Sequence, residues 1–545
     1  MQEKTFSLPS TGVGVDQAGF TARVESNQRK LRTSLRQAYD FIVCGSGSSG
    51  SVVARRLAEN PDTSVLLLEA GGTDDLPRIL DASRWRENFL SDQDWAFETR
   101  ANPQLNGRSM SWPMGRVLGG SSSINGMAWA RGHKNDWDFF ASESGDDDWS
   151  YRSVLDIYRR IEHWQGPSNP EWRGADGLVT IHQQTRSPLN AALFECCASR
   201  GIPCYPDQNG RLMETEGGAA LGEYLIADGK RISIFRSYTY PYMDRPNLTV
   251  LTHALVTRIV IEGAKAVGVE VIHNGKQRRF EVDRELILSL GAIHTPKVLM
   301  QSGIGDAEEL QKFGIDVVQH LPGVGRNLQD HLLVAACVWE YPSKEEPRSR
   351  NPTAGHLLWK SDKAFDAPDL LCLAVNDRFR GPATEDLDAS ARYWSIVPGV
   401  VRLKSRGRIH LTGPDPTSPV DIDAQTFSEP ADLKAAMLGV ELCRDLGNSV
   451  AFRQFKAREI MPGQRGRQEL ESFVRNATVS FWHYAGTTKM GCDEMSVVDG
   501  ALKVHGIKRL RIADGSIMPR VTTGNTMAPC VIIGERAALL IQADL

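Results

Sequence analysis

A glycine-rich turn between two strand-like segments constrains the fold of this chain most. Residues 39–44 form a short apolar run typical of a buried strand. The turn at residues 45–50 reads Gly-Ser-Gly-Ser-Ser-Gly and matches the pattern G-x-G-x-x-G. Residues 51–58 then carry apolar side chains at helical spacing, and residues 64–69 are a second strand-like run that ends in Glu69. This order of strand, turn, helix and strand predicts the start of a doubly wound parallel sheet.

The turn has the features of a dinucleotide-binding site. Gly45 permits the tight turn, Gly47 lets the backbone approach a pyrophosphate, and Gly50 lets helix and strand pack closely, while the helix N-terminus adds free N–H groups. Glu69 stands 19 residues after Gly50, where a carboxylate binds ribose hydroxyls and disfavours the 2′-phosphate of NADP. To this part of the cofactor site we assign Gly45, Gly47, Ser48, Ser49, Gly50, Glu69 and Ala70. The turn alone leaves NAD and FAD as alternatives.

The composition points to a small molecule as the partner. The chain has 545 residues, too many for one hydrophobic core, so at least two structural units are expected. Its 63 Lys and Arg residues nearly balance 67 Asp and Glu residues, which gives no reason to expect nucleic acid or an anionic membrane surface. Nine cysteines, none in C-x-x-C spacing, favour a reducing compartment and indicate no zinc site. Because no apolar stretch reaches about 20 residues and no signal sequence opens the chain, we expect a cytoplasmic protein without a membrane span.

Four further segments carry a family resemblance. Residues 115–125 (Gly-Arg-Val-Leu-Gly-Gly-Ser-Ser-Ser-Ile-Asn) resemble the first signature of the glucose–methanol–choline (GMC) oxidoreductases, a family of FAD-dependent enzymes. Residues 291–305 resemble the second signature of that family. Residues 322–331 and the run from 483 to 534 are also similar to family segments. The motifs follow the family's order, so the resemblance covers most of the chain.

The resemblance implies a fold of two interwoven units. One is a Rossmann-like α/β domain that binds FAD, and the other is an α+β substrate domain with an antiparallel sheet. We expect residues 1–37 to form an N-terminal arm. The expected FAD-binding domain consists of residues 38–150, 248–334 and 476–545. The expected substrate domain consists of residues 151–247 and 335–475.

The resemblance also implies how FAD is held. Some members attach the flavin through a histidine just before the asparagine of the first signature, but Ile124 stands at that position here, so non-covalent FAD is expected. Small residues and hydroxyls around Gly120 let the backbone approach the flavin. The remaining cofactor-binding residues implied by the resemblance are Arg116, Gly119, Gly120, Ser121, Asn125, Gly126, Met127, Ala128, Val256, Trp482, Asp514, Gly515, Asn525, Thr526 and Met527.

His483 is similar to the active-site histidine of the family. Flavin-dependent alcohol oxidation needs a base for the hydroxyl proton while hydride leaves carbon for flavin N5, and the ordinary pKa of histidine, near ~6.5, suits this role. The family usually has proline after this histidine, whereas Tyr484 follows it here. We interpret Tyr484 as a change of pocket shape, and His294 and His331 as structural residues.

A second departure from the family occurs near the C-terminus. Met527 lies 44 positions after His483, where many relatives have asparagine, and a thioether donates no hydrogen bond to an alcohol oxygen. Asn525 lies nearby, but the family places that asparagine against the flavin. We therefore predict that His483 works without the usual protein partner beside an apolar wall at Met527. Such a wall fits an aromatic or alkyl primary alcohol.

The predicted function is FAD-dependent oxidation of a primary alcohol to an aldehyde. Its partners are a small alcohol and molecular oxygen or another electron acceptor, so the chain is an oxidase or a dehydrogenase. A flavin disulfide reductase would need a redox cysteine pair and a second nicotinamide motif, and neither is visible. Because of Met527, a non-redox relative of the hydroxynitrile lyase or photodecarboxylase type stays open as the alternative.

Overall fold

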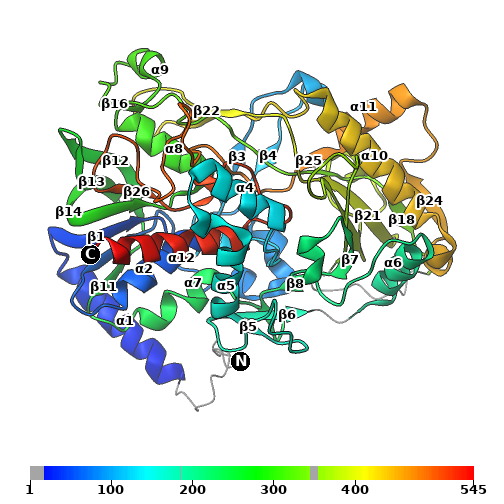
Figure 1. Cartoon of the computed structure of the whole chain (residues 1–545), viewed down its shortest axis with the longest axis horizontal. Helices are drawn as coiled ribbons and strands as arrows, with labels where there is room; N and C mark the ends of the chain where they lie inside the picture. The colour runs from blue at the N-terminus through cyan, green and yellow to red at the C-terminus, as the bar shows by residue number, and fades with distance from the viewer. Residues whose placement is uncertain (1–16, 184–185, 344–353) are drawn as a thin grey trace.

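The computed structural model describes residues 17–183, 186–343 and 354–545, and its two large sheets lie side by side (Figure 1). The first sheet has seven strands in the order β11-β2-β1-β14-β13-β12, with β26 paired to β14. The pairs that involve β1, β2, β11 and β26 are parallel, whereas β12, β13 and β14 form an antiparallel extension. The strands are β1 (Ala38–Cys44), β2 (Val65–Leu68), β11 (Leu248–Leu251), β12 (Ala254–Glu262), β13 (Lys265–His273), β14 (Lys276–Leu288) and β26 (Leu510–Ile512).

Helices pack against this sheet at the site predicted from the sequence. The largely buried β1 and the fully buried β2 are joined by α2 (Ser48–Ala58), which packs against α12 (Met527–Ala543). Figure 1 shows these two helices together on one side of the sheet. α8 (Gly291–Gln301) follows β14 and packs against β12, and α1 (Gln17–Thr33) packs against β11. The predicted doubly wound unit is confirmed, and part of the expected N-terminal arm is a helix; residues 1–16 lie outside the described residues.

The second large sheet is antiparallel and has eight strands. Its order is β24-β18-β21-β20-β19-β7, while β17 pairs with both β21 and β25. α10 (Pro430–Gly447) and α6 (Pro188–Ser199) pack on it, followed by α11 (Arg467–Ala477) on α10. The strands are β7 (Gly218–Leu221), β17 (Leu332–Val334), β18 (Val338–Glu340), β19 (Gly355–Trp359), β20 (Leu370–Val375), β21 (Tyr393–Val400), β24 (Arg458–Met461) and β25 (Thr478–Ser480).

The sheets differ from the expected division of the chain at two points. Residues 80–150 contain η1 (Ala82–Asn88) and α4 (Lys134–Ser144), whose N-terminus is capped by His133. β17 and β25 were placed in the FAD-binding unit, yet both belong to the eight-stranded sheet. The proposed division of the chain therefore shifts by a few residues at these two points. β17 and β25 belong to the eight-stranded sheet because they pair with strands far away in the sequence, and no local sequence pattern reveals such pairing.

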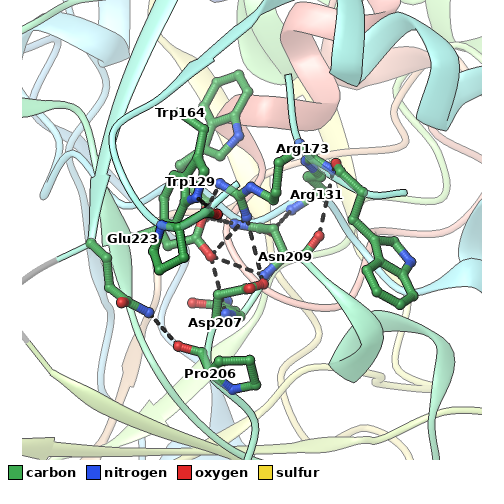
Figure 2. A network of polar contacts seen from close by, with 12 residues as sticks. Trp129, Arg131, Trp164, Arg173, Pro206, Asp207, Asn209 and Glu223 are labelled. Carbon is green, nitrogen blue, oxygen red and sulfur yellow. Dashed lines mark hydrogen bonds and ion pairs between the residues drawn. The ribbon is translucent and has the colours of Figure 1, made fainter. Parts of the chain in front are cut away.

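A buried ionic network surrounds Glu223 (Figure 2). Glu223 accepts hydrogen bonds from Arg173 at 2.8 and 3.1 Å and from the Asn209 side chain at 2.8 Å. The same Asn209 amide donates to the carbonyl of Trp129 at 2.8 Å, and Arg173 also pairs with Glu162 at 2.9 Å. Burial alone would raise the pKa of Glu223, but Arg173 and Asn209 outweigh it and hold this pKa below its ordinary value. The network fixes the backbone that leads into residues 126–128.

Within the part of the chain that the structure describes, no helix combines the length and the apolar character needed to cross a bilayer.

Candidate active site

A cavity of about 720 Å³ lies between the two sheets and collects most of the residues singled out in the sequence. Its volume is in the range of cofactor and ligand sites. The predicted residues that line it are Gly45, Gly47, Ser48, Ser49, Glu69, Ala70, Gly120, Ser121, Asn125, Gly126, Met127, Ala128, Val256, Trp482, His483, Asp514, Gly515, Asn525, Thr526 and Met527. Residues from positions 45 to 530 thus meet in one space.

Three predicted cofactor residues stand behind the cavity wall. A Cβ on Gly50 would lie 1.9 Å from the carbonyl oxygen of Gly45, so this glycine serves the close packing of helix and strand. Arg116 lies over the ring of Trp95 at 4.9 Å, and the N–H of Gly119 donates to the Ser46 hydroxyl at 3.2 Å. None of the three lines the cavity, and their assignment to the cofactor site stays a prediction.

Glu69 is held rigidly at the end of β2. Its carboxylate accepts hydrogen bonds from the Ser46 hydroxyl at 2.6 Å and from the N–H of Gly71 at 2.9 Å. Burial raises the pKa of Glu69, and these hydrogen bonds only partly offset that effect. The side chain is therefore fixed in place where a ribose hydroxyl can reach it.

Asp514 ties the end of β26 to the start of α8. One carboxylate oxygen accepts from the N–H of Gly291 at 2.9 Å and from the Thr295 hydroxyl at 2.6 Å, and the other accepts from the N–H of Ser516 at 2.8 Å. Burial raises the pKa of Asp514 against these hydrogen bonds. The cavity wall at Asp514 and Gly515 is thus built from two elements far apart in the sequence.

His483 is the centre of the polar groups at the other end of the cavity. Its Nε2 lies 3.1 Å from Nδ2 of Asn525, and its Nδ1 lies 2.9 Å from Nδ1 of His331. Because an amide nitrogen only donates, Nε2 of His483 is an acceptor and its Nδ1 carries the proton that His331 accepts. The unprotonated nitrogen therefore faces the cavity.

The surroundings keep His483 neutral and fixed. Its side chain is 7% exposed, and burial, followed by the nearby His331, lowers its pKa well below the ordinary value. Its backbone N–H donates to Asp330 at 2.8 Å, and the Ser480 hydroxyl donates to the same carboxyl group at 2.5 Å. Burial raises the pKa of Asp330 to about 7. A neutral, oriented imidazole is able to accept a proton at neutral pH.

The structure gives His483 two partners that the sequence analysis did not assign to it. Asn525, which was assigned to the flavin alone, is hydrogen-bonded to His483, so this histidine does not lack a protein partner. His331 was interpreted as structural but contacts the same ring. Met527 lines the cavity as expected, yet its sulfur accepts a hydrogen bond from the Asn125 side chain at 3.1 Å. An asparagine 42 positions after His483 was visible in the sequence, but the two-residue offset from the family position hid its role.

Comparison with known proteins decides the family. The N-terminal GMC oxidoreductase model matches residues 39–333, and the C-terminal model matches residues 404–534. The chain belongs to the GMC oxidoreductase family. The resemblance found in the sequence is confirmed, and with it FAD as the cofactor.

This GMC oxidoreductase has well-covered relatives in sequence and structure. It is 36% identical to the oxygen-dependent choline dehydrogenase of Citrobacter koseri, over 92% of this chain and 95% of that protein. The same comparison with the enzyme of that name from Stenotrophomonas maltophilia gives 36% identity over 93% and 96% of the two chains. Pyridoxine 4-oxidase from Mesorbium loti has a TM-score of 0.87 at 29% identity, over 92% of this chain and 98% of that chain. Formate oxidase from Aspergillus oryzae has a TM-score of 0.85 at 25% identity, over 93% and 98%.

The chain is therefore an FAD-dependent oxidoreductase that acts on CH–OH donors, and the predicted fold class is confirmed. These relatives do not favour the alternative of a lyase or photodecarboxylase.

The cavity of this GMC oxidoreductase fits the cofactor. A Cβ added to Gly47 or to Gly126 would meet no protein atom within 4 Å, so both glycines open a space that side chains would fill. Ser48 and Ser49 begin α2, whose N–H groups face an anion at this end. Met127 and Trp482 both adopt the left-handed backbone region, at φ 60° and 63°, which is uncommon for such side chains and recurs at ligand sites.

An aromatic wall missed by the sequence analysis closes the cavity next to His483. Trp482 lies 6.1 Å from Trp85 and 5.0 Å from Phe89, both on or beside η1, and 6.3 Å from Phe379. The ring of Phe481 lies 4.4 Å from the His483 ring. Trp85 and Phe379 come from segments whose patterns gave no ligand signal. Their place in the cavity wall becomes visible only through their contacts with Trp482, which is far from both in the sequence.

Proposed function

We propose that this enzyme oxidises an aromatic or alkyl primary alcohol to an aldehyde, with His483 as the general base. The single observation behind this role is the Nε2 atom of His483, an acceptor that lines the cavity at 3.1 Å from the Asn525 amide. Bound FAD supplies the hydride acceptor. The aromatic wall of Trp85, Phe89 and Trp482 favours an apolar alcohol over a polyol.

Each group around His483 has a distinct task in this proposal. When the alcohol binds, the amide of Asn525 donates to the alcohol oxygen in place of Nε2 of His483, and the alcohol proton points toward Nε2. His331 accepts from Nδ1, which selects the tautomer of His483 whose Nε2 carries no proton. Asp330 holds the backbone of His483, and the surrounding aromatic rings exclude water. Met527 shapes the wall and has no part in proton transfer.

The test is anaerobic reduction of the purified holoenzyme by a panel of primary alcohols, followed by admission of air. Bleaching of the flavin absorbance with aromatic or alkyl alcohols is expected, and the return of colour in air separates an oxidase from a dehydrogenase. His483→Gln is expected to slow the reduction by about 10²- to 10⁴-fold, the usual contribution of a positioned base, while FAD stays bound. An H483Q enzyme that is reduced at the original rate would exclude this residue as the base.

We further propose that FAD is held without a covalent bond and that the enzyme works in the cytoplasm. Ile124, the residue at the attachment position, is buried and offers no nucleophile. The nine cysteines are all free thiols, which fits a reducing compartment. Acid precipitation should release all flavin into the supernatant; flavin that stays with the protein would contradict the first statement.

A further inference from the structure

Arg86 stands in the aromatic wall beside His483. It belongs to η1, and its guanidinium carbon lies 5.0 Å from the ring of Trp85 and 5.7 Å from the ring of Phe379. Both rings contact Trp482, the residue that precedes His483. Arg86 also lines the cavity. Its charge is therefore located at the end where the alcohol reacts, and Glu69 with the glycine-rich turn is at the other end.

This arginine lacks an anionic partner among the residues that the structure describes. No hydrogen bond or ion pair within 4.0 Å involves its guanidinium, although the aromatic faces on both sides contact it. Arg84, two positions earlier on η1, is bound by Glu87 at 3.0 Å. Arg378, also at the cavity, donates to the carbonyl of Leu387 at 2.5 Å. Arg86 alone of these three arginines keeps its donors free.

The surroundings of Arg86 favour an incoming anion. The pKa of Arg86 is lowered, and burial is the largest cause. The exposed Asp377 raises this pKa in part, and Arg380 lowers it. A guanidinium that is partly removed from water gains more from a carboxylate than an exposed one does, because water competes less for its donors. The planar fork of arginine matches a carboxylate with two parallel hydrogen bonds.

The carboxylates along the cavity are already engaged by other groups. Glu69 and Asp514 accept hydrogen bonds from backbone and hydroxyl groups, as described above. Glu87 is bound to Arg84, and Asp377 accepts from the N–H of Arg378 at 2.7 Å. A quaternary ammonium substrate would meet aromatic rings but also the positive charge of Arg86. The cavity end is suited to an aromatic ring that carries a negative charge.

We propose that Arg86 binds the carboxylate of an aromatic primary alcohol whose hydroxymethyl group faces His483. The aromatic ring of the substrate packs against Trp482 and Phe379. Arg86 holds the carboxylate at one end, and the neutral His483 faces the hydroxymethyl group at the other. This inference rests on the proposed alcohol oxidation. It assigns a substrate class that excludes choline-like cations.

The first experiment measures binding without turnover. Oxidised holoenzyme is titrated with benzoate, benzamide and phenyltrimethylammonium, and perturbation of the flavin absorbance reports the dissociation constants. Benzoate is expected to bind about 10- to 100-fold more tightly than benzamide, the range of a charge-assisted hydrogen bond, and the cation most weakly. In Arg86→Gln the preference for benzoate over benzamide should vanish. Arg84→Gln is the matched control, because it removes a charge already bound by Glu87, and should keep the preference.

The second experiment measures turnover with 3- and 4-(hydroxymethyl)benzoate and their amides. At least one acid isomer should exceed its amide in kcat/KM by a similar factor. R86Q should remove this difference between acid and amide, whereas R84Q should keep it. Equal binding of benzoate and benzamide, or equal losses in R86Q and R84Q, would overturn the assignment. If benzoate binds through Arg86 but no alcohol reduces the flavin, the proposed oxidation fails and the anion site stands.

Discussion

At the scale of single residues, Asn525 and Met527 both line the cavity with His483, but only Asn525 is hydrogen-bonded to its ring. Asn525 offers its amide nitrogen to Nε2, whereas the sulfur of Met527 is occupied by the Asn125 side chain. Only the first of these contacts touches the atom that receives the proton. Both residues lie at the start of one element, within two positions of each other.

This contrast predicts unequal effects of two substitutions. Asn525→Ala removes the donor and is expected to lower the rate constant of flavin reduction by about 10- to 100-fold, the size of a hydrogen bond to a charged group. Met527→Leu keeps volume and apolar character and should change that constant less than about 3-fold. Stopped-flow reduction under anaerobic conditions measures both, with bound FAD determined by absorbance. An M527L enzyme as slow as N525A would contradict the assignment.

The sequence predicted individual site residues where the chemistry of the residue type was decisive. Glu69 was found from its position after the glycine-rich turn and His483 from its place in a family motif, and both line the cavity. Asn525 was known as a family position but was given to the flavin, because a sequence shows how far apart two residues are along the chain and not which atoms meet. Arg86 carried no signal, since an arginine in an irregular segment is ordinary until its partners are known to be absent.

At the scale of elements, the contact between α2 and α12 secures the turn that faces the phosphates. Glu535 of α12 is buried and accepts from Arg56 of α2 at 2.8 to 3.1 Å and from the Tyr238 hydroxyl at 2.9 Å. The Ser49 hydroxyl, in the first turn of α2, donates to the carbonyl of Cys530 at 2.7 Å. The C-terminal helix thus supports the cofactor site from behind.

Removing the buried carboxylate should destabilise the pair of helices. Glu535→Ala leaves Arg56 and Tyr238 without their shared acceptor and is expected to lower the free energy of unfolding by about 2 to 4 kcal/mol. A decrease of several degrees in the thermal midpoint of the holoenzyme measures this loss. Glu59→Ala removes a partly exposed partner of Arg56 and should shift the midpoint only slightly. Equal shifts of the thermal midpoint in the two variants would show that the buried Glu535 contributes no more to stability than the partly exposed Glu59.

Elements formed by local pattern were predicted well, and those defined by distant pairing were not. β1, α2 and β2 follow one another in the sequence, so apolar periodicity and the glycine turn were sufficient to place them. β17 and β25 are three-residue strands that exist because they pair with each other across more than 140 residues. Three residues are too few to show the alternation of apolar and polar side chains that predicts a strand.

At the scale of the whole molecule, buried neutral histidines set the response to acid. Burial lowers the pKa of His294 and of His331 to about 3 and that of His356 to about 4. In the unfolded chain these groups bind protons below about pH 6.5, whereas in the folded chain they remain neutral. Stability should therefore fall as the pH drops below about 6.5. Asp330 acts in the opposite direction, because its raised pKa of about 7 means that the folded state binds its proton first.

Burial also raises the pKa values of Glu69 and Asp514, but Asp330 is the carboxyl group raised to about 7, and three histidines oppose it. The thermal midpoint is therefore expected to fall between pH 7 and pH 5. Differential scanning fluorimetry at constant ionic strength measures the slope. His356→Gln removes one of the titrating groups and should flatten the slope by about one proton, or ~1.4 kcal/mol per pH unit. A midpoint that rises on acidification would show that Asp330 and similar groups dominate instead.

The antiparallel pairing of β17 with β25 places two histidines of the candidate site beside the same pair of strands. Leu332 of β17 pairs with Ser480 of β25. His331 directly precedes β17 and His483 follows β25, so the register of these two short strands sets how the two histidines lie relative to each other. His331 and His483 thus lie next to strands of the eight-stranded sheet, whereas Glu69 and the glycine-rich turn lie next to strands of the seven-stranded sheet. Under the proposed function, proton transfer and hydride transfer both depend on how these two halves fit together. A substitution far from either histidine that tilts one half against the other would slow turnover while leaving each half's own chemistry intact.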